Sequence, residues 1–120
     1  MRENVLVNKS FKFAVRIVNL YKYLCDNKKE FVLSKQLLRC GTSIGANVNE
    51  AQDAQSTDDF ISKLSISLKE ARETQYWIEL LKETNYLKSK EADSILKDLI
   101  EIIKLLVSII KTTKENNAKK

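Results

Sequence analysis

Apolar residues recur at three- and four-residue spacing along four stretches of this sequence, and short polar segments separate the stretches. Such spacing places apolar side chains on one face of an α-helix, and helices joined by short connections lie antiparallel beside each other. The pattern predicts an all-α fold, an antiparallel up-and-down four-helix bundle that forms one domain over residues 1–120. Its polar tail, from about residue 111, is expected to fray. The predicted helices span residues 5–27, 34–53, 56–84 and 89–110.

The first predicted helix has one continuous apolar face, which Phe13 and Leu20 widen on one side. We expect this face to cover the core of the bundle. Its members are Phe11, Ala14, Ile17, Val18, Tyr21, Leu24 and Cys25.

The second predicted helix is unusually thin, because Gly41 and Gly45 lie in its interior among other small residues. A glycine inside a helix costs up to about 1 kcal/mol relative to alanine. Close approach of a neighbouring helix is the simplest feature that would offset this cost. Ser34 is a candidate N-cap for this helix, and Ser56 is the candidate for the third.

The fourth predicted helix is apolar around far more than one face between residues 99 and 110, although a bundle core needs only about three positions per heptad. On the third helix, Trp77 and Leu80 lie off the main apolar stripe. Exposed apolar surface of this extent is typical of an interface, so the pattern predicts an oligomer. The predicted interface residues are Trp77, Leu80, Ile102 and Leu106.

The composition argues against catalysis, since the sequence contains no histidine and therefore lacks the usual general base and the commonest metal ligand. We expect no enzymatic activity, no catalytic residues, no metal and no cofactor. The acidic residues Glu50, Asp53, Asp58 and Asp59 gather around one connection and offer a cation site as the alternative. Their spacing matches no dedicated cation loop, and helix-terminus electrostatics account for Asp58 and Asp59.

The N-terminal residues form no signal peptide, because they lack a sustained apolar core. The most apolar run, residues 99–110, is too short and too charged to cross a bilayer. These features favour a cytoplasmic location. Cys25 and Cys40 lie in apolar helical stretches, which favours buried free thiols over a disulfide.

Charge is unevenly distributed along the chain, whose net charge is +5. Residues 1–40 carry nine basic and three acidic groups, whereas residues 41–86 carry four and eight. A basic surface suits the phosphates of a nucleic acid, and the alternative is an ordinary solvated face. The first helix places three of the candidate residues and also Tyr23 on one face, and the second helix contributes the other two. The candidate nucleic-acid-binding residues are Lys9, Lys12, Arg16, Lys35 and Arg39.

Residues 33–51 read LSKQLLRCGTSIGANVNEA, and the related pattern continues to Tyr76-Trp77. This stretch resembles the four-helix bundle proteins encoded by intervening sequences within bacterial 23S rRNA genes, a family related to accessory variability proteins of diversity-generating retroelements. The resemblance implies a homopentameric ring, and for the retroelement branch it also implies binding to RNA or DNA and to a reverse transcriptase. The helix-packing and motif residues are Gly41, Ser43, Ile44, Gly45, Asn47 and Glu50.

Two polar or aromatic pairs have alternative interpretations. Asn47 and Glu50 are either ligand contacts or, as we favour, partners in hydrogen bonds to a neighbouring helix. Tyr76 and Trp77 either stack on bases or, as we favour for Trp77, pack at a subunit interface.

Two functions from different classes follow from these patterns. The first is a non-enzymatic oligomer that is associated with nucleic acid, most simply RNA, through a basic surface repeated around a ring. The alternative is a protein-binding scaffold or adaptor with no nucleic-acid role.

Overall fold

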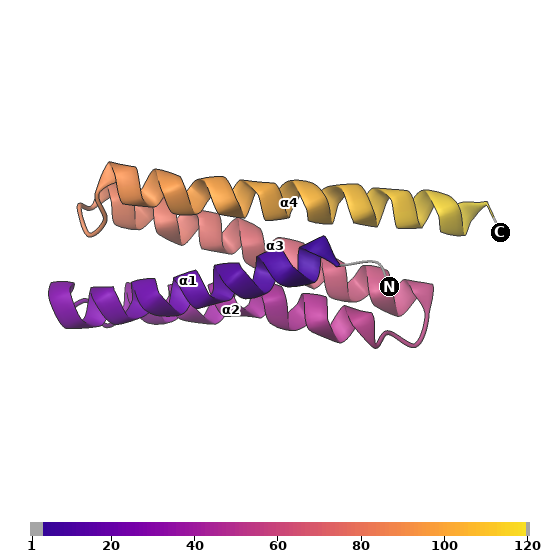
Figure 1. Ribbon diagram of the computed structural model, residues 1–120, viewed down its shortest axis with the longest axis horizontal. Coiled ribbons are helices and arrows are strands. Elements are labelled where there is room, and N and C mark those ends of the chain that lie inside the picture. Colours follow the sequence, from indigo (N-terminus) through magenta and orange to yellow (C-terminus); the bar gives the residue numbers. More distant parts are fainter. Residues whose placement is uncertain (1–3, 120) are drawn as a thin grey trace.

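Four helices follow one another along the chain and run antiparallel to their sequence neighbours in a computed structural model (Figure 1). The structure describes residues 4–119, and within them no strand is present. The bundle measures 53 × 25 × 21 Å, and the packed pairs are α1 with α2, α2 with α3, α3 with α4 and α1 with α4. The predicted all-α four-helix bundle is therefore confirmed. The helices are α1 (Val5–Lys28), α2 (Leu33–Gln52), α3 (Thr57–Glu83) and α4 (Ser89–Ala118).

The N-terminus of α2 is capped by Glu30 rather than by Ser34. The Glu30 carboxylate accepts hydrogen bonds from the backbone N–H groups of Val32, Leu33 and Ser34, at 3.2, 3.1 and 2.7 Å. Ser34 is fully buried inside the helix, where its hydroxyl donates to the carbonyl of Glu30. The predicted Ser34 cap is wrong because a carboxylate can accept several of the orphan N–H groups at once. Ser56 does cap α3 through the N–H of Asp59, as predicted.

The face of α1 that packs into the core differs from the predicted face. Phe13, Ile17, Leu20 and Leu24 are buried, whereas Phe11 is 62% exposed. Two overlapping apolar stripes run along this helix, and the sequence pattern does not show which one faces inward. The neighbouring helices decide between them, since Ile17 meets Gly41 of α2 and Phe13 lies beside Ile102 of α4.

Close packing of α1 on α2 depends on the two glycines, as expected from the thin second helix. A Cβ atom on Gly45 would lie 3.1 Å from the backbone oxygen of Ser10, and one on Gly41 would lie 2.8 Å from the Ile17 side chain. The backbone of α1 therefore rests directly on α2 at Gly45. On the opposite side of α2, the buried hydroxyl of Ser67 in α3 donates to the carbonyl of Ile44 at 2.9 Å.

The last helix departs from the sequence prediction in two ways. It continues to Ala118 through the segment expected to fray, since no glycine or proline interrupts it. Ile102 and Leu106 are 1% and 0% exposed. Their predicted role at an oligomer interface is corrected, because both side chains belong to the core of the single subunit. No described helix is long and apolar enough to cross a membrane.

Candidate functional surfaces

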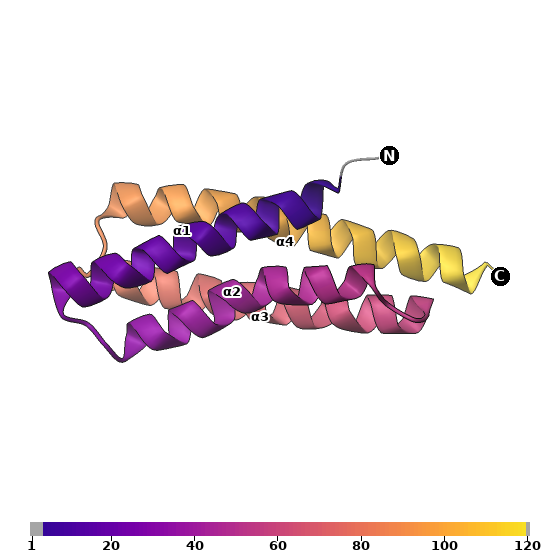
Figure 2. The same cartoon turned by 60° about the horizontal axis from the view of Figure 1, so that its bottom comes forward.

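The surface shared by α1 and α4 is held by exposed polar contacts. In Figure 2 the two helices cross rather than run side by side. Between them, Lys9 pairs with Glu101 at 3.0 Å, and Arg16 pairs with Asp98 at 2.8 Å. The Arg16 guanidinium also donates to the Ser94 hydroxyl at 2.7 Å and to its backbone carbonyl at 3.3 Å. This polar surface between α1 and α4 is called the α1/α4 seam.

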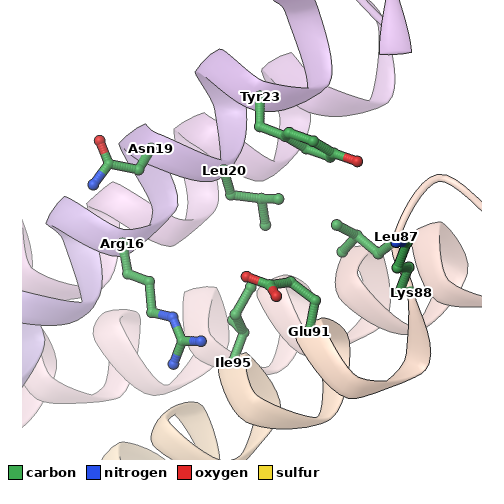
Figure 3. A pocket seen from close by; sticks show the side chains of 8 residues that line it. All are labelled: Arg16, Asn19, Leu20, Tyr23, Leu87, Lys88, Glu91 and Ile95. Atoms are coloured by element: carbon green, nitrogen blue, oxygen red, sulfur yellow. The ribbon is translucent and has the colours of Figure 1, made fainter. Parts of the chain in front are cut away.

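Where the helices separate beyond Arg16, the α1/α4 seam opens into a cavity of about 380 Å³ (Figure 3). Leu20, Leu87 and Ile95 supply its apolar wall. Tyr23 extends from α1 toward Leu87, and the remaining lining side chains are polar or charged. The cavity therefore combines an apolar wall, an aromatic ring and charged groups. The lining residues are Arg16, Asn19, Leu20, Tyr23, Leu87, Lys88, Glu91 and Ile95.

A smaller hollow of about 140 Å³ lies along the same seam and is lined in part by Lys9 and Lys12. The structure thus places Lys9, Lys12, Arg16 and Tyr23 along one side of α1, as predicted. Lys12 and Lys88 are exposed and form no ion pair within residues 4–119. They are the cations of this seam that remain available to an anion.

The other two candidate basic residues lie on α2 and belong to a different surface. Arg39 pairs with Glu73 at 2.8 Å and with Glu70 at 3.3 Å, both on α3. The hydrogen bond and charge of Glu73, together with the charge of Glu70, raise the pKa of Arg39. Lys35 is exposed and has no ion pair among the described residues. The five candidates therefore do not form one continuous stripe.

The motif residues Asn47 and Glu50 do not bridge helices. The Asn47 side-chain amide donates to the carbonyl of Ser43, one turn earlier in the same helix, at 2.8 Å. Glu50 is exposed, and its carboxylate has no hydrogen-bond partner within residues 4–119. The favoured hydrogen bonds to a neighbouring helix are thus corrected, because the polar contacts between α2 and α3 are made by Ser67 and by the ion pairs of Arg39. The sequence signal that was missed is the spacing of the small buried residues Ser67, Ala71 and Thr74 on α3.

The acidic residues between α2 and α3 make the contacts that are usual at the start of a helix. Asp58 and Asp59 lie in the first turn of α3, and the Asp59 carboxylate accepts the N–H of Gln55 at 3.3 Å. Across residues 4–119, no group of three or more potential ligand side chains is arranged to hold a metal ion.

Both cysteines are free thiols, as predicted. Cys40 is fully buried, and this burial raises the pKa of its thiol. Cys25 is half-buried, with its Sγ 3.8 Å from the Ser34 hydroxyl.

The aromatic pair on α3 lies at the surface. The rings of Tyr76 and Trp77 meet edge to face, with centroids 5.3 Å apart, and Tyr76 is 59% exposed. Trp77 and Leu80 are half-buried. The indole N–H of Trp77 has no acceptor within the described chain.

These features define an all-α bundle with a tightly packed α1–α2–α3 side and a polar, partly open α1/α4 seam. A family profile described as 23S rRNA-intervening sequence protein matches residues 2–108, so the chain belongs to that family. No match was found among curated protein sequences. A crystal structure from Bacteroides thetaiotaomicron VPI-5482, of a protein of unknown function from the S23 ribosomal protein family, is 62% identical. The match covers 89% of this chain and 99% of that one, with a TM-score of 0.89.

Proposed function

We propose that this chain is a non-enzymatic, oligomeric binding protein of the cytoplasm that contacts RNA through the α1/α4 seam. The observation that carries the proposal is the cavity in this seam, where Arg16, Lys88 and the Tyr23 ring surround an apolar wall. The resemblance described above gives the expected assembly, a homopentameric ring. No catalytic step is assigned, since the sequence offers no histidine.

The charges of the seam support phosphate binding. Lys12 and Lys88 form no ion pair among the described residues, although Glu91 lines the cavity beside Lys88. Lys9 and Arg16 do have partners, but about half of the Glu101 and Asp98 side-chain surface is exposed. Exposed ion pairs of this kind stabilise a protein by about 0–1 kcal/mol. A polyanion can therefore take over these cations at little energetic cost.

The cavity itself suits an unstacked base of single-stranded RNA. Proteins that bind single strands combine a positively charged groove with aromatic side chains on which bases stack. Tyr23 offers its ring at the cavity, and the Asn19 amide lines the same space. A base next to Tyr23 would leave its phosphates within reach of the surrounding cations. Repetition of such a site around a ring would strengthen weak single contacts by avidity.

The charge test compares two double variants of equal charge change. Lys12→Glu with Lys88→Glu removes the unpaired cations of the seam, whereas Lys97→Glu with Lys104→Glu changes exposed cations elsewhere on α4. RNA affinity is measured by fluorescence anisotropy across a salt series with a single-stranded oligonucleotide. Each lost phosphate contact lowers the salt slope by about 0.7. We expect a slope reduction of about 1.4 for the seam variant and little change for the control.

The stacking test compares Tyr23→Ala with Tyr23→Phe. Loss of one base-stacking contact weakens binding by about 1–3 kcal/mol, so we expect Tyr23→Ala to lose about tenfold or more in RNA affinity. Tyr23→Phe keeps the ring and should stay close to wild type. If both the charge and the ring variants bind RNA as the wild type does, the alternative, a protein-binding scaffold or adaptor with no nucleic-acid role, replaces this proposal.

A further inference from the structure

One residue of the cavity in the α1/α4 seam has no role in binding phosphates. Glu91 lines this cavity together with Lys88 and Tyr23, and Figure 3 shows its carboxylate directed into the space. Within residues 4–119 that carboxylate has neither a hydrogen-bond partner nor an ion-pair partner. An ionised carboxylate repels phosphate and accepts hydrogen bonds without donating any. A ligand that fits this cavity must therefore offer N–H donors to Glu91.

The position of Glu91 on α4 places its carboxylate at the edge of the apolar wall. Glu91 lies in the first turn of α4, where an acidic residue suits the positive end of the helix dipole. The dipole accounts for the charge at this helix end but does not require the side chain to enter the cavity. Ile95, one turn later on the same face, is buried in the apolar wall. A flat ring that covers this wall therefore brings its edge close to the carboxylate.

Arg16 supplies hydrogen-bond donors from the α1 side of the same cavity. Its guanidinium donates to the Asp98 carboxylate at 2.8 Å and to the Ser94 hydroxyl and carbonyl at 2.7 and 3.3 Å. These contacts hold the side chain in place and leave other N–H groups of the guanidinium free for a ligand. The cavity thus presents a fixed donor from α1 and an acceptor from α4.

Guanine is the base whose polar groups match this combination. Its N1–H and N2–H groups are adjacent donors that one carboxylate can accept together, and its O6 and N7 atoms are the acceptors that arginine prefers. Uracil has a carbonyl oxygen on each side of its single N–H, and adenine and cytosine have a bare nitrogen beside their amino group. The cavity volume of about 380 Å³ lies near the lower end of the roughly 300–1,000 Å³ of small-ligand pockets, which suits a single base.

We propose that the cavity selects guanine, with Glu91 accepting hydrogen bonds from N1–H and N2–H of a base that stacks on Tyr23. Arg16 donates to the O6 and N7 edge of the same base. The inference rests on the proposed RNA contact and adds a base preference to it. Glu91 reads the base, whereas Lys12 and Lys88 hold the phosphates of any sequence.

The test measures base preference in addition to affinity. Short oligouridylates carry guanine, hypoxanthine, adenine, cytosine or uracil at one central position, and fluorescence anisotropy at low salt gives the Kd of each. We expect a central guanine to strengthen binding by about tenfold or more relative to uracil. Hypoxanthine lacks only the 2-amino group of guanine, so its affinity should lie between these two.

Glu91→Gln and a control variant separate base recognition from charge. Glu91→Gln removes a negative charge, so it should not weaken binding of the uracil oligonucleotide, but it should abolish most of the preference for guanine. Glu115→Gln makes the same charge change at an exposed position near the other end of α4 and should keep the full preference. Circular dichroism checks that both variants fold.

The outcomes separate this inference from the proposed function. If the wild-type protein binds all five oligonucleotides equally, or prefers a base other than guanine, the inference is overturned while the RNA contact stands. A guanine preference that persists unchanged in Glu91→Gln also overturns it, because Glu91 then does not read the base. If none of the oligonucleotides binds, the inference and the proposed RNA contact fail together.

Discussion

The first helix packs against two neighbours in two different ways. Against α2 its backbone approaches so closely that a Cβ atom on Gly45 would lie 3.1 Å from the Ser10 carbonyl oxygen. Against α4 long charged side chains make the ion pairs, Lys9 with Glu101 and Arg16 with Asp98. Small residues allow the first contact, whereas the second spans a wider and wetter separation.

The tight side contributes mainly to the stability of the fold, whereas the α1/α4 seam is suited to binding. The α1–α2–α3 side buries side chains, both glycines and the Ser67 hydroxyl in close contacts. The α1/α4 seam includes a cavity of about 380 Å³ whose lining carries charge. Segments with few buried contacts open at lower free energy than the core, and such segments commonly bind ligands. Changes on the tight side should therefore reduce the free energy of unfolding, and changes in the seam should mainly alter binding.

The largest effect is expected from Gly45→Leu. A leucine here has no space, since the nearest obstacle is the Ser10 backbone rather than a side chain that can rotate. Overpacking a tight contact costs about 1–3 kcal/mol and occasionally more, and we expect about 3 kcal/mol or more. Urea unfolding followed by circular dichroism measures this loss.

Gly45→Ala is the matched control for that variant. Its Cβ atom requires a shift of only a few tenths of an ångström, and alanine recovers up to about 1 kcal/mol of helix propensity. We expect a stability within about 1 kcal/mol of wild type. Equal losses for alanine and leucine, or no loss for leucine, would contradict the close-packing account.

The second effect concerns the turn that leads into α2. Burial acts to raise the pKa of Glu30, but hydrogen bonds from three backbone N–H groups outweigh it and the pKa is lowered. Because the lowered pKa favours the folded state when Glu30 is ionised, its stabilisation is complete above the ordinary carboxyl pKa of about 4.3. That stabilisation disappears as the pH falls through the lowered value.

Glu30→Gln should therefore cost about 1 kcal/mol at neutral pH and progressively less in acid. Thermal unfolding of both proteins between pH 7 and pH 2 measures the difference in free energy. A difference that is constant over this range would show that the carboxylate charge does not hold the turn.

The sequence predicts the number and order of the helices and most of their limits, because spacing and loop length are local properties, but it misses the end of α4 at Ala118 and the cap of α2. It also predicts the glycine contact, since two glycines inside a helix require a compensating neighbour. It does not predict the rotation of α1, where Phe11 and Phe13 belong to competing stripes. Packing against the neighbouring helices, among them α4, makes Phe13 the buried one, at 2% exposure.

The candidate sites illustrate the same limit. Lys9, Lys12 and Arg16 follow from helical spacing alone, and the structure keeps them on one side of α1. The opposing carboxylates of Asp98 and Glu101 lie 82 and 92 residues after their partners in the chain, so no local pattern reveals these pairs. Ile102 and Leu106 were predicted at an interface for a related reason. Apolar spacing does not separate core positions from surface positions on a helix that is apolar around most of its circumference.

The third effect tests the α2–α3 contact on the tight side. Ser67→Ala removes the buried hydroxyl that donates to the Ile44 carbonyl at 2.9 Å. That carbonyl keeps its place in α2, so the expected loss is that of one ordinary hydrogen bond, about 1 kcal/mol. Thr84→Ala, at an exposed hydroxyl near the end of α3, is the control and should cost less. A larger loss for the control would place the stabilising contact elsewhere.

The smallest effect on stability is expected in the α1/α4 seam. Arg16→Leu removes the ion pair with Asp98 and the hydrogen bonds to Ser94, but both charged side chains are partly exposed, at 31% and 50%. Pairs of this kind contribute about 0–1 kcal/mol, and salt screens them. We expect a loss of about 0.5 kcal/mol at low salt, measured by urea unfolding, and less at 1 M salt. The same variant should weaken RNA binding clearly, since Arg16 borders the cavity.

Arg16→Leu would reverse the comparison between the two sides if it lowered the free energy of unfolding as much as Gly45→Leu does. The seam would then hold the bundle together, and its cavity would be a defect of packing instead of a binding site.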